Sequence, residues 1–248
     1  MNPASHELHG RRALVTGAAS GIGAAIVRRL QAAGATVAGL DIVPEIASDC
    51  DLIVDLRNGA TLEQALAQMN RRIGMPDIVV HAAAITAMGG VLEVDPERWL
   101  EIYDVNVVGA VRLLRHCTGA MKQRGGGAVV LMSSINADFA TPTQAAYAAS
   151  KGALNNLMKT AALEFAPAGI RVNAIAPASV DTPAMRASMA RAADPDKAAR
   201  VNMRRHPLER WGTAEEVAEL TLFLVSDRAA WITGAVHRID GGASVTRR

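Results

Sequence analysis

Residues 13–34 read ALVTGAASGIGAAIVRRLQAAG and contain three local patterns in succession. Residues 13–16 are an apolar, strand-like run, residues 17–23 are rich in glycine, and residues 24–33 have a helical pattern that ends at Gly34. The order predicts a strand, a tight turn and a helix. Such a turn brings backbone N–H groups close to a phosphate, whose charge the helix dipole favours. The spacing Gly-x-x-x-Gly-x-Gly differs from the commoner Gly-x-Gly-x-x-Gly, and glycines also form ordinary turns.

The next segment supplies an acidic residue at an informative place. Residues 35–40 are predicted to form a second buried strand that leads to Asp41, 18 residues beyond Gly23. An acid at the end of the second strand accepts hydrogen bonds from the adenosine ribose hydroxyls and repels a 2′-phosphate. No Arg or Lys lies in residues 17–23 or directly after Asp41. The pattern favours NAD over NADP, with a turn or helix cap as the alternative role of Asp41.

Strand-like and helix-like segments alternate along the rest of the chain, which is typical of a parallel sheet covered on both faces. The fold class predicted is a single-domain, Rossmann-type, doubly wound α/β structure over residues 1–248. Further strands are expected at residues 52–54, 77–80, 128–132, 171–176 and 235–239, seven in all. Helices are expected at residues 61–73, from a cap at Asp95 onward, at residues 147–165 and at residues 213–226.

Composition excludes several classes of protein. The 248 residues are 50% hydrophobic, which is enough for one large core. The net charge is +2 and the basic residues are dispersed, so nucleic acid is not an expected partner. Cys50 and Cys117 show no metal-binding spacing and are expected to be reduced thiols, with no metal site. Without a signal peptide or a long apolar stretch, we expect a soluble cytoplasmic protein with no membrane partner.

Chemistry-bearing residues follow the fifth predicted strand. Ser134 lies at its carboxyl end, where open α/β sheets place their ligands. Tyr147 and Lys151 are four residues apart on one predicted helix face, so their polar groups can converge. We expect the Lys151 charge to lower the pKa of Tyr147 and make it a proton shuttle, the alternative being a solvated surface pair. Asn106 lies inside a predicted helix, where Asn is a poor choice unless it faces outward or has a specific role.

The segment of residues 179–206 differs from the rest of the chain. It is rich in methionine and arginine, contains proline, and shows no strand period. We interpret it as a mobile substrate lid with short helices.

These elements together resemble the short-chain dehydrogenase/reductase family over about residues 11–242. The resemblance rests on six features in the family's order. They are Thr16-Gly17-x-x-x-Gly21-Ile22-Gly23, Asn106, Ser134, Tyr147-x-x-x-Lys151, Asn173-Ala-Ile-Ala-Pro177 with Thr182, and Asp240-Gly-Gly.

The resemblance implies hydride transfer between a nicotinamide and an alcohol or carbonyl carbon. Tyr147 would exchange the proton, Lys151 would lower the Tyr147 pKa and hold the nicotinamide ribose, and Ser134 would bind the substrate oxygen. Asn106 would help to hold a water that passes protons from Lys151 to solvent. The implied substrate contacts are Ser134, Asn136, Gln144 and Tyr147. The implied cofactor contacts are Gly17, Ser20, Ile22, Gly23, Asp41, Asp55, Leu56, Ala83, Tyr147, Lys151, Pro177, Val180 and Thr182.

Two departures from the family pattern are visible. The usual Asn-Asn-Ala-Gly after the fourth strand is His81-Ala82-Ala83-Ala84 here, which predicts a change in how the backbone beneath the cofactor is held. We expect His81 to replace the lost hydrogen bonds in a structural role. The usual Pro-Gly after the sixth strand is Pro177-Ala178, whose extra methyl group is expected to trim the pocket.

The leading hypothesis is an NAD-dependent secondary-alcohol dehydrogenase. Its expected pocket has amide and hydroxyl groups with few aromatics, which leans toward a polyol, sugar or small hydroxy compound as the small-molecule substrate. The alternatives are an NADPH-dependent 3-oxoacyl-thioester reductase and a non-catalytic nucleotide-binding scaffold. Family resemblance further implies a homotetramer, built on the helices that carry Asn106 and Tyr147 and on the last strand.

Overall fold

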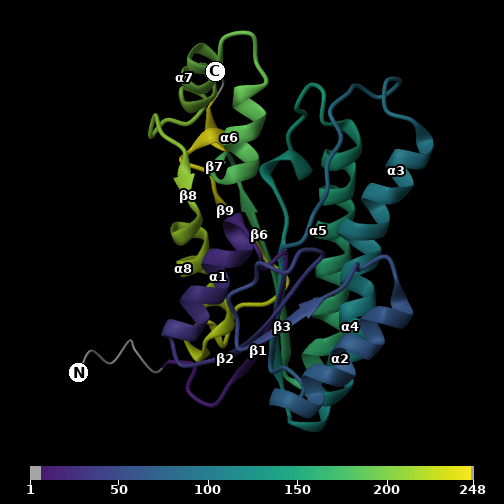
Figure 1. The fold of residues 1–248 in the computed structure, drawn as a ribbon. Helices are drawn as coiled ribbons and strands as arrows, with labels where there is room; N and C mark the ends of the chain where they lie inside the picture. The colour runs from purple at the N-terminus through teal and green to yellow at the C-terminus, as the bar shows by residue number, and fades with distance from the viewer. Residues whose placement is uncertain (1–6, 247–248) are drawn as a thin grey trace.

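A seven-stranded parallel sheet forms the centre of the molecule (Figure 1). The computed structural model describes residues 7–246. The strand order is β3-β2-β1-β4-β5-β6-β9, as the doubly wound prediction requires. The chain winds outward in one direction from β1 to β3 and in the other from β4 to β9, so the switch point lies between β1 and β4. The strands are β1 (Arg12–Thr16), β2 (Thr36–Asp41), β3 (Cys50–Ile53), β4 (Ile78–His81), β5 (Gly127–Met132), β6 (Ile170–Pro177) and β9 (Val236–Ile239).

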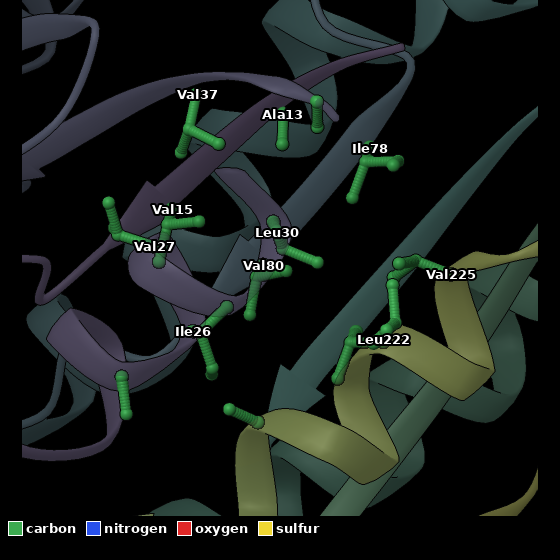
Figure 2. Close-up of a cluster of buried hydrophobic side chains, with 14 of the residues drawn as sticks. Ala13, Val15, Ile26, Val27, Leu30, Val37, Ile78, Val80, Leu222 and Val225 are labelled. Carbon is green, nitrogen blue, oxygen red and sulfur yellow. The ribbon is translucent and has the colours of Figure 1, made fainter. Parts of the chain in front are cut away.

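Helices cover both faces of the sheet because its strands are apolar on both sides. Helices α1 (Gly21–Ala32) and α8 (Ala214–Val225) lie on one face. Figure 2 shows side chains of this face, with Val15 and Val80 of the sheet near Ile26 of α1 and Leu222 of α8. Helices α2 (Gly59–Ile73), α4 (Gly109–Gln123) and α5 (Ala145–Phe165) enclose a second core on the other face. The two cores hold the carboxyl ends of β1, β4 and β5 in fixed relative positions.

The helix expected after Asp95 is long but not uniform. It consists of α3 (Pro96–Tyr103), a π-helical turn η2 (Asp104–Val108), and α4. Asp95 occupies the N-cap position as expected, but its side chain makes no capping hydrogen bond. Asn106 lies in the π turn and is fully buried. Single π turns inside helices are frequently found at functional sites.

The region beyond the carboxyl ends of the strands, at the top of Figure 1, contains helices α6 (Pro183–Ala190) and α7 (Pro195–Met203). Short helices were expected here and are present. The sequence showed no strand period in this segment, but the structure contains a short strand there. Strand β7 (Val180–Asp181) pairs in parallel with β8 (Gly212–Thr213) in a small second sheet. Short helical turns complete the structure at η3 (Ile135–Ala137), η4 (Ala166–Ala168), η5 (Asp227–Ala229) and η6 (Ala243–Val245).

Helix α8 begins with a reciprocal pair of capping hydrogen bonds. The Thr213 hydroxyl accepts a hydrogen bond from the Glu216 N–H, and the Glu216 carboxylate accepts one from the Thr213 N–H. Within residues 7–246, no helix is both long and apolar enough to cross a lipid bilayer.

Candidate active site

The glycine-rich turn between β1 and α1 needs its glycines for close backbone approach. Gly17 has a φ of +68°, and a Cβ there would lie 2.9 Å from the Ala83 nitrogen. A Cβ on Gly23 would lie 1.9 Å from the Gly17 carbonyl oxygen. Any side chain would therefore separate the turn from α1 and from the segment after β4. The bare backbone forms one wall of a cleft at the switch point of the sheet.

Two features of this wall suit a dinucleotide. Ser20 is the N-cap residue of α1 but makes no side-chain capping bond, so no side chain competes for the N–H groups of the first turn. The Asp41 carboxylate accepts hydrogen bonds from the Ala19 N–H (3.0 Å) and the Ile42 N–H (2.7 Å). A helix terminus of this kind favours an anion such as a pyrophosphate, and a carboxylate at the end of the second strand suits an adenosine ribose.

A cavity of about 440 Å³ runs along the turn. Its lining includes Gly17, Ser20, Ile22, Gly23, Asp41, Asp55, Leu56, Ala83 and Thr182, all predicted cofactor contacts. Thr182 has two roles, since its hydroxyl also caps α6 by accepting from the Met185 N–H at 3.2 Å. Pro177, Val180, Tyr147 and Lys151 do not line this cavity. They lie at the end of β6, in β7 and on α5.

Sequence reasoning missed two arginines in the cavity lining, Arg57 and Arg98. Arg57 binds the Asp55 carboxylate through several hydrogen bonds, the shortest 2.6 Å, and this interaction lowers the Asp55 pKa. The Asp55-x-Arg57 spacing was the available signal. For Arg98, which bonds the Thr86 carbonyl from the start of α3, the sequence held no signal, because only the tertiary fold brings α3 to the cavity.

Ser134, Tyr147 and Lys151 come together at the carboxyl end of β5. Ser134 lies two residues beyond the end of β5 and is buried. Lys151, on α5, is almost fully buried. The Lys151 Nζ donates to the Met132 carbonyl at 2.6 Å and lies 5.4 Å from the centroid of the Tyr147 ring. The predicted convergence of the two α5 side chains is therefore present in the structure.

Burial sets the protonation of this pair. It lowers the pKa of Lys151 to about 7, because the ammonium is removed from water. Burial also raises the pKa of Tyr147, with hydrogen bonding to Ser134 opposing the shift. The expectation that Lys151 lowers the Tyr147 pKa is not met in this structure, since desolvation of the phenolate dominates. Lys151 titrates near neutral pH, which suits a group that exchanges protons.

Asn106 joins three elements around this pair. Its amide oxygen accepts from the Ile85 N–H at 2.9 Å, and its amide nitrogen donates to the Ile85 carbonyl and to the Ser150 hydroxyl, both at 3.0 Å. Ser150 in turn donates to the Tyr147 carbonyl at 2.7 Å. Asn106 thus has the specific role expected of an asparagine inside a helix. Its part in holding a water near Lys151 stays a prediction.

His81 replaces hydrogen bonds of the altered segment after β4, as expected. The Thr16 hydroxyl oxygen accepts from the N–H groups of Ala82 and Ala83, so its hydrogen is left for the His81 Nδ1 at 3.0 Å. The His81 Nε2 then carries the ring hydrogen and donates to the Asn106 carbonyl at 3.2 Å. Complete burial lowers the pKa of His81 to about 3 and keeps the ring neutral.

Three of the predicted substrate contacts, Ser134, Asn136 and Gln144, lie on the segment between β5 and α5, and the fourth, Tyr147, is on α5. The Ser134 hydroxyl accepts from the Asn136 N–H at 3.1 Å, and the Asn136 amide donates to the Gln144 amide oxygen at 2.7 Å. Thr141, which sequence reasoning missed, donates to the Asn136 amide oxygen at 2.8 Å. Within residues 7–246, no group of three or more His, Cys, Asp or Glu side chains is arranged to hold a metal ion.

Comparison with known proteins identifies the family. A family profile described as enoyl-(acyl carrier protein) reductase matches residues 17–244. The chain belongs to the short-chain dehydrogenase/reductase family. It is 36% identical to oxidoreductase UcpA of Escherichia coli strain K12, with 96% of each chain covered. It is 37% identical to L-xylulose reductase of Bos taurus, over 96% of this chain and 98% of the relative.

A solved structure agrees with the fold. Aldohexose dehydrogenase of Thermoplasma acidophilum, in ligand-free form, superimposes with a TM-score of 0.92 at 30% identity. The match covers 97% of this chain and 96% of that one. As a member of this family, the protein is an NAD(P)-dependent oxidoreductase that acts on a small molecule.

Proposed function

We propose that the protein is an NAD-dependent dehydrogenase of secondary alcohols, acting on a sugar, polyol or small hydroxy compound, or on the corresponding ketone. The observation that carries the proposal is the meeting of Ser134, Tyr147 and Lys151 at the carboxyl end of β5, next to a cleft walled by bare glycine backbone. The preference for NAD rests on Asp41.

The residues of the cleft fit a nicotinamide dinucleotide. Gly17 and Gly23 let the turn pack directly against the segment after β4 and against α1, which keeps the backbone wall of the cleft in the shape that a pyrophosphate needs. The Asp41 carboxylate accepts from ribose hydroxyls and repels a 2′-phosphate. Arg57 is committed to Asp55 in an ion pair of 2.6 Å, so it does not offset that repulsion. The dinucleotide supplies a hydride acceptor or donor when bound.

The protein's own residues handle the substrate oxygen and its proton. The Ser134 hydroxyl donates a hydrogen bond to the substrate oxygen and keeps it close to the Tyr147 hydroxyl. During alcohol oxidation Tyr147 accepts the hydroxyl proton, and during ketone reduction it donates that proton. Lys151 lies beside the Tyr147 ring, and its pKa of about 7 lets it exchange a proton at neutral pH and so restore the proton of Tyr147.

The segment of residues 179–206 is proposed to act as a substrate lid. Thr182, Pro183 and Ala184 line the cofactor cavity, so movement of α6 would change access to it. Helices α6 and α7 contribute no buried residues to the core, which leaves them free to shift at low cost.

The sugar or polyol class is supported by the amides of the pocket and by two relatives whose names refer to sugars, L-xylulose reductase and aldohexose dehydrogenase. The second candidate, an NADPH-dependent reductase of 3-oxoacyl thioesters, draws support from the acyl-carrier substrate in the description of the family profile. Asp41 argues against it, because the carboxylate disfavours the 2′-phosphate of NADPH.

Absorbance at the reduced-nicotinamide band tests the proposal. The enzyme is offered NAD and then NADP with a panel of polyols, sugars, hydroxy acids and simple secondary alcohols. We expect turnover with NAD on one class of this panel. Turnover of oxoacyl thioesters with NADPH alone would establish the second candidate instead. If NADH binds but neither panel is turned over, the site is a nucleotide-binding scaffold and the proposal is wrong.

A further inference from the structure

The amide of Gln144 has a fixed orientation, set by a chain of hydrogen bonds. Thr141 donates its hydroxyl hydrogen to the Asn136 amide oxygen at 2.8 Å. Asn136 therefore presents its amide nitrogen on the other side, where it donates to the Gln144 amide oxygen at 2.7 Å. The Gln144 oxygen is engaged, and its NH₂ group, with two donor hydrogens, has no hydrogen-bond partner within residues 7–246.

The backbone around Gln144 is held in a strained shape. Thr143 has a φ of +64°, which is unfavourable for a β-branched residue. The Thr143 carbonyl accepts from the Gly89 N–H at 2.9 Å, and Gln144 forms a β-bridge with Gly89. Strain of this kind persists where the surrounding contacts over-determine the backbone, and it gathers at ligand sites. Side-chain and backbone contacts thus fix the same residue.

Gln144 is also next to the reacting groups. It precedes Tyr147 by three residues at the start of α5, which places the two on neighbouring positions of one helix face. Its partner Asn136 donates its N–H to the Ser134 hydroxyl at 3.1 Å. The Lys151 Nζ already donates to the Met132 carbonyl. The polar groups of Ser134, Asn136 and Gln144 are neutral, which suits a neutral substrate oxygen better than a carboxylate.

We propose that the Gln144 NH₂ group selects substrates with a neutral oxygen acceptor on the carbon next to the reacting carbon. Such substrates are vicinal diols, hydroxyketones and their ethers. This inference rests on the proposed function and names its substrate class. A substrate without that oxygen leaves the amide hydrogens unpaired on binding, which costs affinity. Gln144 is a specificity-determining residue, and Thr141 and Asn136 are positioning residues that act through it.

Two ketones of nearly equal shape test the inference, 1-methoxypropan-2-one and pentan-2-one. They differ by an ether oxygen in place of a CH₂ group, on the carbon next to the carbonyl. The ratio of their kcat/KM values with NADH is measured for the wild type and for Gln144→Met, which removes both amide donors. We expect the ratio to fall about three- to ten-fold, the loss of one hydrogen bond. Differences in intrinsic reactivity cancel in this comparison.

Three further variants separate recognition from general damage. Thr141→Val leaves the Asn136 amide without its hydrogen-bond donor, so the ratio should fall in the same direction but less. Gln144→Glu replaces the donor with an acceptor and should lower the ratio at least as far as Gln144→Met. Gln68→Met, on the exposed face of α2, should keep the wild-type ratio.

The outcomes distinguish the inference from the function on which it rests. An unchanged ratio in both Gln144 variants, with both ketones reduced, overturns the inference alone. A lower ratio in Gln68→Met as well would also overturn it, because the effect would not depend on the amide next to Tyr147. If the wild type reduces neither ketone with NADH but turns over a member of the alcohol and sugar panel with NAD, the inference is overturned and the proposed function stands. If the whole panel also fails, both are overturned.

Discussion

Burial acts on Tyr147 and Lys151 in the same way, by favouring the neutral form of each side chain. It raises the tyrosine pKa and lowers the lysine pKa to about 7. The neutral phenol can donate a proton, and a lysine that titrates near neutral pH can then return a proton to the phenolate. The pair is thus prepared for proton exchange in either direction of the reaction.

Replacing the phenol removes the proton carrier and little else. We predict that Tyr147→Phe abolishes turnover while NADH binding stays nearly intact, because Tyr147 does not line the cavity beside the glycine turn. Steady-state kinetics and fluorescence titration with NADH measure the two properties separately. Turnover above a tenth of the wild-type rate would contradict the role of Tyr147.

Asp41 is predicted to set the cofactor preference. Asp41→Ala removes the charge that repels a 2′-phosphate, so the ratio of kcat/KM for NAD to that for NADP should fall by about ten-fold or more. Paired assays with the two cofactors measure it. An unchanged ratio would assign the preference to another group, with Arg57 the next residue to test.

His81 gives the fold a defined sensitivity to acid. Its pKa is about 3 in the folded protein and 6.5 when unperturbed, so the unfolded chain binds more protons between these values. Stability therefore rises with pH across this window and is lost as the pH falls. At pH 5 the loss amounts to about 2 kcal/mol.

The variant His81→Asn tests this linkage, since it removes the titrating ring. Urea unfolding at pH 7 and pH 5 gives the free energy of unfolding of both proteins. The wild type should lose about 2 kcal/mol more than the variant between the two pH values. Equal losses would show that other groups, such as the ion-paired Asp77, account for the acid sensitivity.

The candidate catalytic residues were predictable from the sequence because their spacing along one helix carries the information. Tyr147 and Lys151 share a helix face, and Ser134 follows an apolar strand. Arg98 was not predictable, because only the tertiary fold brings α3 to the cavity. Thr141 was not predictable, because its bond to Asn136 depends on the irregular path of the segment between β5 and α5. The direction of the Tyr147 pKa was also missed, since spacing shows a neighbouring charge but not the depth of burial.

At the scale of an element, the junction of β1 and α1 tolerates no added atom. Gly23→Ala would place a Cβ 1.9 Å from the Gly17 carbonyl oxygen, so α1 must move away from the turn. We predict weaker NADH binding by at least about ten-fold and a loss of stability of about 1–3 kcal/mol. Fluorescence titration and urea unfolding measure the two effects.

Gly119→Ala on α4 is the matched control for Gly23→Ala. No heavy atom lies within 4 Å of the Cβ that it adds. It should stabilise the protein by about 0.5–1 kcal/mol and leave NADH binding as in the wild type. Similar binding losses in both variants would mean that the turn is not the cofactor cradle.

Each main helix and strand could be predicted from the period of its apolar residues and from the positions of glycines. Some of their boundaries could not. The third strand begins at Cys50, two residues before the predicted start. The π turn around Asn106 had no sequence signature beyond a poorly placed asparagine. Its hydrogen bonds to Ile85 and Ser150, which favour the widened turn, come from other segments.

At the scale of the whole molecule, we predict the homotetramer that family resemblance implies. Val111 on α4 and Leu163 on α5 are exposed apolar side chains on helices named for the interface. Strand β9 is an edge of the sheet, and the buried His237 Nε2 on it has no hydrogen-bond partner in residues 7–246. Unpaired edges and apolar faces of this kind are expected to be covered by further copies.

Light scattering after size-exclusion chromatography should give four times the chain mass of 26.0 kDa. Val111→Glu should give a smaller particle, because a charge is then buried at the contact. Ile53→Glu, also at an exposed position but on the opposite edge strand β3, should remain tetrameric. A wild-type mass of one chain would contradict the prediction.

The doubly wound sheet was the most predictable feature, because several independent patterns in the sequence indicate it. Buried strands, amphipathic helices and the glycine turn each indicate the same topology. The small β7 and β8 pair was not predictable, since two-residue strands carry no period.

The long helix that contains the π turn should tolerate insertions and deletions poorly. An α-helix rotates by about 100° per residue, so losing one residue between Pro96 and Gln123 would turn everything downstream by that angle. Leu113 and Cys117 of α4 would leave the core, and Asn106 would swing away from Ser150. Insertions and deletions are therefore far more damaging in this helix than in the exposed connection between α6 and α7.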